Sequence, residues 1–268
     1  MKNREDVLII KNYHQKIFGI VYYAKCKKSD KVIIFCNPFA EEEKEVHLHL
    51  SNFARSLSDS GINVIRFHYR GTGDSFGRFE DYTLKTRISD IKKVISYAKT
   101  HFSHAKIGLF GIRLGATLAT LVANDNNIIE YLLLWEPIVR GKDIFNELYT
   151  FRYQEEGLSE HKIIERIRRN FRKLQESGYM DLYGYKVKQE LVKEIQRIDL
   201  LNLGKRYKNN LLIIQNSNDA VSQFNNSFRD ICKSQEFLKV KTQPYWLHFR
   251  YKLPSKLFRV TIDWLLRN

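Results

Sequence analysis

The pattern Gly111-Ile112-Arg113-Leu114-Gly115 is the part of this chain that most resembles a catalytic motif. Glycines two positions on either side of a central residue are typical of the G-x-S-x-G nucleophile elbow, a sharp turn between a strand and a helix. That turn strains the backbone of its central residue, and a side chain at either glycine would collide with the adjoining strand or helix. The sequence therefore predicts an elbow in which Arg113 replaces the serine.

An arginine in this place cannot attack a carbonyl, because its guanidinium is protonated throughout the physiological pH range. The cation would lie at the positive end of a helix dipole, so it needs an anion as partner. Internal candidates are Asp219, Asp74 and the run Glu41–Glu43, and an external one is a carboxylate, phosphate or sulfate of a ligand. The first kind makes the elbow a structural salt bridge, and the second makes it an anion-binding site.

Two further side chains occur in the order that a catalytic acid and base would have. Asp219 follows an expected strand at 211–215, and His248 follows another at 237–241. A plain loop aspartate and a structural histidine are the alternatives. Without a serine, the pair would activate water directly for hydrolysis. Asp219, His248 and Arg113 are therefore the predicted catalytic residues.

The remaining parts of such a site are expected on neighbouring loops. The backbone N–H groups of Phe39 and Leu114 are the predicted oxyanion-hole donors. Arg113, Glu41 and Trp246 are the predicted substrate contacts. No metal-ligand spacing occurs among the histidines, so neither a metal nor a cofactor is expected.

The cysteines are few and scattered. None of the three, Cys26, Cys36 and Cys232, is part of a C-x-x-C pair, and their spacing does not suggest a disulfide framework. A reducing compartment is therefore favoured. Cys36 is an alternative nucleophile at the end of an expected strand, but a buried small apolar side chain is the commoner role of such a cysteine.

The elements that must position these residues alternate between strands and helices. Expected strands cover 7–11, 17–24, 31–36, 63–67, 131–135, 211–215 and 237–241, and the elbow strand and helix lie within 106–119. Expected helices cover 45–60, 87–100, 162–175, 187–198, 220–232 and 255–266. This alternation predicts an α/β fold with a mostly parallel sheet covered by helices on both faces.

The alternation stops between residues 139 and 208, where two charged helices follow one another without a strand. Each carries an apolar stripe on one face. We interpret this segment as a helical lid inserted into one core, formed by residues 1–138 and 209–268; extra helices on the sheet flank are the alternative.

The net charge of +15 raises the question of an anionic partner. The excess lies outside residues 34–139, and no stripe of lysines interleaved with aromatic residues appears, so nucleic-acid binding is not expected. No segment approaches the length of a membrane span, and the N-terminus lacks a signal-peptide core. A cytoplasmic protein is expected, and its oligomeric state is left open.

Four segments carry a family resemblance: NPFAEE (37–42), YRGTGDS (69–75), GIRLGA (111–116) and LLWEPIVRG (133–141). Through them the chain resembles the α/β-hydrolase superfamily in its serine-aminopeptidase-like branch, and more closely the exosortase A system-associated hydrolases of the second type. The resemblance implies an α/β-hydrolase fold and an inherited elbow arginine, whereas His248 is not clearly part of the pattern.

Two functions are compatible with these features. The first is hydrolysis of an ester, thioester or amide that carries an anionic group, with Arg113 holding the anion and Asp219 and His248 activating water. The alternative is a non-catalytic pseudo-hydrolase that binds an anionic ligand or a protein partner.

Overall fold

A computed structural model describes residues 4–12, 14–25, 29–204, 206–216, 219–247 and 255–268. Its centre is an eight-stranded sheet of order β1-β2-β4-β3-β5-β6-β9-β10. The strands are β1 (Glu5–Asn12), β2 (Gln15–Tyr22), β3 (Lys31–Cys36), β4 (Asn63–Phe67), β5 (Lys106–Ile112), β6 (Ile129–Trp135), β9 (Asn210–Gln215) and β10 (Ser234–Lys239).

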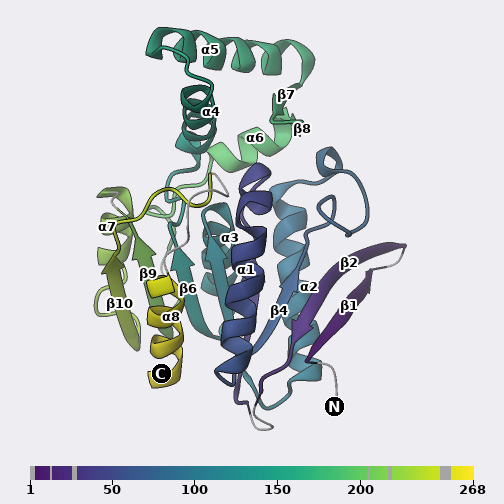
Figure 1. Cartoon of the computed structure of the whole chain (residues 1–268), viewed down its shortest axis with the longest axis vertical. Helices are drawn as coiled ribbons and strands as arrows, with labels where there is room; N and C mark the ends of the chain where they lie inside the picture. The colour runs from purple at the N-terminus through teal and green to yellow at the C-terminus, as the bar shows by residue number, and fades with distance from the viewer. Residues whose placement is uncertain (1–3, 13, 26–28, 205, 217–218, 248–254) are drawn as a thin grey trace.

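The strands from β4 to β10 in the sheet order are parallel, whereas β1 and β2 form an antiparallel hairpin that joins β4 antiparallel. Strands β3, β4 and β9 are buried along their whole length, which explains the apolar runs 32–36 of β3 and 211–214 of β9. Because parallel strands end at the same edge, the loops after β3, β5, β6 and β9 meet at the carboxyl edge of the sheet (Figure 1).

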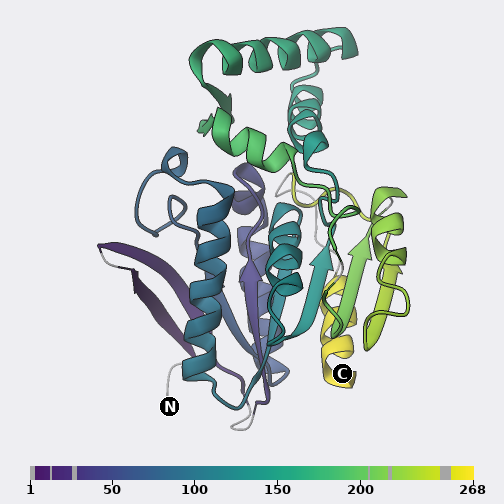
Figure 2. The ribbon, with the colours of Figure 1, turned by 180° about the vertical axis from the view of Figure 1, so that it is seen from behind.

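Helices cover both faces of the sheet (Figures 1 and 2). They are α1 (Glu41–Asp59) and α8 (Ser255–Arg267) on one face, and α2 (Leu84–His101), α3 (Leu114–Asn124) and α7 (Asp219–Asn226) on the other. Neighbouring residues of β3 point to opposite faces: Ile34 joins the core under α2 and α3, and Phe35 joins the core under α1 and α8. The central strands of the sheet are therefore buried between two apolar layers.

The helices and the hairpin between β6 and β9 lie beyond the carboxyl edge of the sheet (Figures 1 and 2). It contains α4 (Ile144–Glu155), α5 (Glu160–Ser177), the hairpin β7 (Tyr179–Leu182) and β8 (Tyr185–Lys188), and α6 (Gln189–Gln196). Two short 3-10 helices complete the fold, η1 (Phe79–Asp81) and η2 (Gly141–Asp143). We call residues 139–208 the insertion.

Several element boundaries differ from those predicted by the sequence. Helix α4 and the β7–β8 hairpin were not expected, and the helix expected at 187–198 begins at Gln189 because Val187 and Lys188 belong to β8. The helix expected at 220–232 ends at Asn226, and α1 begins at Glu41 instead of at residue 45. No described helix is both long and apolar enough to span a membrane.

Candidate functional site

Arg113 occupies a sharp turn between β5 and α3. Its backbone has φ 55° and ψ −124°, a conformation that non-glycine residues rarely adopt. A Cβ atom at Gly115 would lie 2.1 Å from the carbonyl oxygen of Cys36, and one at Gly111 would lie 2.5 Å from the backbone nitrogen of Ala116. Both glycines are therefore required by close backbone packing, and the turn presents its central side chain at the carboxyl edge of the sheet.

The guanidinium of Arg113 is held by two carboxylates of the chain. Its Nε donates a 2.9 Å hydrogen bond to Oε1 of Glu42 at the start of α1, and its Nη2 lies 2.8 Å from Oε2 of Glu147 on α4. The side chains of Arg113 and Glu42 are 6% and 1% exposed. The cation also lies 5.1 Å from the centre of the Trp246 ring. Arg113 is thus a buried cation whose anions come from the protein.

The other anions considered for Arg113 have different surroundings. Asp74 is exposed, and Glu41 forms a 3.0 Å ion pair with Lys44. Glu43 is buried and pairs with His68 at 2.8 Å. Glu42 and Glu43, the second and third residues of the run Glu41–Glu43, are therefore both buried and both paired within the chain.

Burial dominates the acidity of the carboxyl groups around Arg113. It raises the pKa of Glu42 to about 7, even though the charge and hydrogen bond of Arg113 act in the opposite direction. It also raises the pKa of Glu136, which follows β6, to about 7 against the lowering effect of Arg113. Burial lowers the pKa of Arg113, but Glu42 and Glu147 more than offset this and leave it above its ordinary value. The arginine therefore stays charged.

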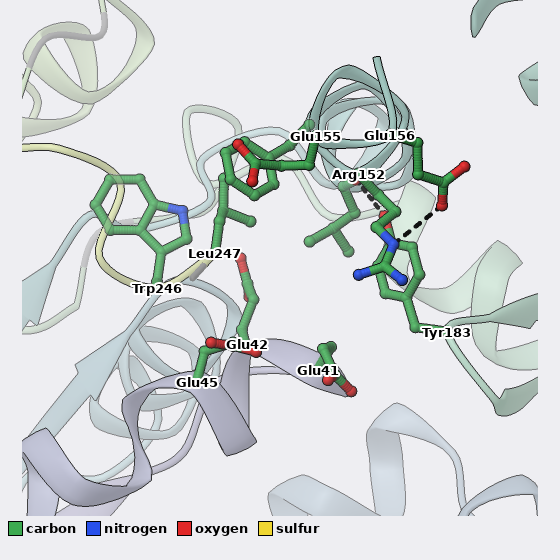
Figure 3. Close-up of a pocket in the computed structure, with 11 residues that line it drawn as sticks. Glu41, Glu42, Glu45, Arg152, Glu155, Glu156, Tyr183, Trp246 and Leu247 are labelled. Carbon is green, nitrogen blue, oxygen red and sulfur yellow. Dashed lines mark hydrogen bonds and ion pairs between the residues drawn. The ribbon is translucent and has the colours of Figure 1, made fainter. Parts of the chain in front are cut away.

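A pocket of about 370 Å³ opens beside this ion pair, between α1, α4 and the 246–247 segment (Figure 3). Its lining is dominated by carboxylates and aromatic rings. The lining residues are Glu41, Glu42, Glu45, Leu148, Phe151, Arg152, Glu155, Glu156, Tyr183, Trp246 and Leu247. Glu41 and Trp246, two of the predicted substrate contacts, thus line this pocket, whereas Arg113 lines a different cavity of about 400 Å³ with Glu147.

The predicted oxyanion donors lie on two segments that contact each other, since Gly115 packs directly against the backbone of Cys36 and Asn37. The Asn37 side chain fixes this loop by donating to the carbonyl of Phe67 at 2.8 Å. Among the described residues, the N–H of Leu114 has no hydrogen-bond acceptor, whereas the backbone N–H of Phe39 acts on the Glu42 carboxylate and lowers its pKa.

The remaining candidates are placed as follows. Asp219 is the first residue of α7, and His248 lies outside the described residues. Cys36 is buried, and burial raises the pKa of its thiol to about 12 although a hydrogen bond with Tyr69 lowers it. A protonated thiol of this kind is not a nucleophile. Across the described parts of the chain, no three His, Cys, Asp or Glu side chains are placed to hold a metal ion.

Two carboxylates of the site were missed at the level of sequence. Glu147 gave no signal because α4 itself was not expected. Glu136 did carry one, since it stands between the strand residue Trp135 and Pro137 at the carboxyl edge of the sheet. Its positive φ of 49° is a further strained position next to the elbow.

The strand order, the parallel crossovers and the turn between β5 and α3 define an α/β-hydrolase fold. Solved structures of esterases and hydrolases have the same fold. Est1E from Butyrivibrio proteoclasticus, solved with ferulic acid bound, matches with a TM-score of 0.70 and 18% identity over 97% of this chain and 98% of that one.

An esterase from Pyrococcus furiosus matches with a TM-score of 0.62 and 19% identity over 98% of this chain and 92% of that one. An α/β serine hydrolase homologue from Coxiella burnetii matches with a TM-score of 0.57 and 16% identity, over 96% of each chain. No family model and no curated protein sequence matches the chain. At these identities the likeness establishes the fold.

Proposed function

We propose that this chain is a non-catalytic protein of the α/β-hydrolase fold that binds a small molecule in the pocket beside the elbow. The observation that carries the proposal is the ion pair at the place of the nucleophile. Arg113 is protonated, buried and paired with Glu42 and Glu147, so it can neither attack a carbonyl nor accept a proton. The nearby thiol of Cys36 is buried and protonated as well.

The partners of Arg113 also bear on what the ligand is. Two carboxylates already offset the charge of this arginine, and five glutamates line the pocket, so an anionic group on the ligand would find no free cation at Arg113. We also propose that the chain is related to the exosortase A system-associated hydrolases of the second type; the elbow arginine and the segments 37–42 and 133–141 support this.

We further propose that the insertion acts as a lid. Helix α4 supplies Glu147 to the elbow and lines the pocket through Leu148 and Phe151. A cytoplasmic location belongs to the same proposal and is supported by the scattered cysteines, of which Cys36 and Cys232 are free thiols.

A second candidate function is hydrolysis of an ester, thioester or amide by water that Asp219 and His248 activate. Two observations favour it: the backbone N–H of Leu114 has no acceptor among the described residues, and the solved structures with this fold include esterases.

Turnover of p-nitrophenyl acetate and of an acyl thioester separates the two candidates. The wild type is expected to match both His248→Ala and the buffer rate. Turnover by the wild type that His248→Ala lowers would overturn the non-catalytic proposal. An Arg113→Ser variant that gains turnover would support it, because only the nucleophile would then have been missing. Circular dichroism of each variant controls for folding.

A further inference from the structure

We infer that the ligand of this pocket is an organic cation, an ammonium or guanidinium group on an apolar body. The inference rests on the proposed function, because it takes the pocket as a binding site. Three features of the pocket carry the inference. Its acidic lining and a buried acceptor without a donor call for the cationic group, and its aromatic wall calls for the apolar body.

The lining of the pocket is acidic in spite of the basic chain. It combines five glutamates, from α1, α4 and the residue after α4, with a single cation, Arg152. That arginine is already paired with Glu156 at 3.1 Å. In the part of the chain that the structure describes, no cation pairs with Glu155, which lies at the rim of the pocket (Figure 3). Glu41 pairs with Lys44 and Glu156 also pairs with Arg166, so the negative charge that favours a cation in the pocket comes from Glu155.

The floor of the pocket holds a buried acceptor that lacks a donor. Glu42 is 1% exposed; its Oε1 accepts from Arg113, whereas its Oε2 is buried and receives no hydrogen bond from any described residue. Figure 3 shows this carboxylate turned toward the cavity. A buried acceptor without a partner is unfavourable by about 1–3 kcal/mol, and a charged N–H donor is its strongest complement. The cationic group of the ligand is therefore assigned to Glu42.

The wall beside Glu42 determines the rest of the ligand. Trp246, Tyr183 and Leu148 present rings and an aliphatic side chain to the cavity, which suits an apolar or aromatic body. The indole Nε1 of Trp246 is a buried donor that lacks an acceptor among the described residues. A ligand with one neutral acceptor on its body, such as a carbonyl or hydroxyl oxygen, would satisfy it.

Three probes of equal ring and similar length test the charge preference: 2-phenylethylammonium, 2-phenylethanol and 3-phenylpropanoate, titrated into the full chain by calorimetry at pH 8, where Glu42 is mostly ionised. The ammonium is expected to bind about tenfold tighter than the alcohol, with no binding of the carboxylate. Equal or tighter binding of the alcohol or the carboxylate would overturn the inference, and so would the absence of ammonium binding.

Matched variants locate the contact. Glu42→Gln is expected to weaken ammonium binding about tenfold, and Glu155→Gln at the rim about threefold. Glu176→Gln, an exposed change on α5 with the same effect on net charge, is expected to leave affinity unchanged. If Glu42→Gln does not fold, Glu155→Gln still decides, because unchanged affinity in that variant contradicts the assignment.

The same samples separate this inference from the proposed function. Turnover that depends on His248, together with ammonium binding, would contradict the non-catalytic proposal but support a cationic ligand. Binding of the carboxylate without any turnover would support a non-catalytic binding pocket but contradict a cationic ligand.

Discussion

The Nε of Arg113 donates a 2.9 Å hydrogen bond to Oε1 of Glu42, a residue 71 positions earlier in the chain. The two side chains come from the turns after β5 and β3, which are neighbours in the sheet. Their pairing converts the place of a nucleophile into a buried ion pair. A buried pair of this kind adds little net stability, but removal of one partner is costly because the other charge stays buried.

Glu42→Ala is accordingly expected to lower the free energy of unfolding by about 3 kcal/mol at pH 8, because it leaves the Arg113 guanidinium with the half-exposed Glu147 alone. Urea unfolding measures this change. Glu41→Ala is the matched control one residue earlier; it breaks only a partly exposed pair with Lys44 and should cost less than about 1 kcal/mol. Equal losses in the two variants would contradict the assigned importance of the buried pair.

The raised pKa of Glu42 predicts a specific pH dependence of stability. The unfolded carboxyl releases its proton near 4.5 and the folded one near 7, so between these values the folded state binds one proton more than the unfolded state. The contribution of Glu42 to the free energy of unfolding therefore falls as pH rises from 4.5 to about 7, and is constant outside that window.

The wild type minus Glu42→Gln difference in unfolding free energy, measured from pH 4.5 to 8, isolates this contribution. The difference should become less favourable to the wild type as pH rises to about 7 and then level off. If the difference instead grows in favour of the wild type over that range, the ion pair with Arg113 lowers the pKa of Glu42 by more than burial raises it.

Gly115→Ala is expected to destabilise the fold by about 1–3 kcal/mol, although alanine within a helix normally improves on glycine. The reason is the added Cβ, which would lie 2.1 Å from the carbonyl of Cys36. Gly204→Ala, where an added Cβ would meet no atom within 4 Å, serves as the control and should change stability by less than about 0.5 kcal/mol. Thermal denaturation of both variants reports the contrast.

Cys36 should resist iodoacetamide in the folded protein. Its thiol is buried, and its pKa of about 12 leaves almost no thiolate at pH 7.5. Mass spectrometry after labelling is expected to find this residue modified only when the protein has first been unfolded in urea. Rapid labelling of Cys36 in the native state would show that its thiol is accessible and reactive, and Cys36 would again be a candidate nucleophile.

The core of the fold was predictable because its signals are local. Unbroken apolar runs such as Ile33–Phe35 gave the buried strands, and the paired glycines around Arg113 gave the turn that the close contacts of Gly115 explain. The insertion was harder to predict. The apolar face of α4 is short, since only Ile144, Phe145, Leu148 and Tyr149 are buried in it.

The β7–β8 hairpin has one signal in the sequence, the glycine at position 184, because glycine favours the positive φ of a hairpin turn. Tyr183 and Gly184 both have positive φ, as the turn of a two-residue hairpin requires, and they separate two segments of four residues.

The partners of Arg113 were only partly predictable. The sequence indicated that it needs an anion and named the run Glu41–Glu43, but the choice of Glu42 depends on the orientation of the first turn of α1. Glu147 depends on how the insertion folds over the sheet.

The two carboxylates around Arg113 belong to different parts of the molecule: Glu42 to the core and Glu147 to the insertion. One cation is therefore shared across the junction between them. If α4 moves away from the sheet, the guanidinium keeps its buried position but loses one of its two anions, so displacement of the insertion carries an electrostatic cost. Arg113 thereby fastens the insertion to the core, and the electrostatic balance of the elbow depends on where α4 lies.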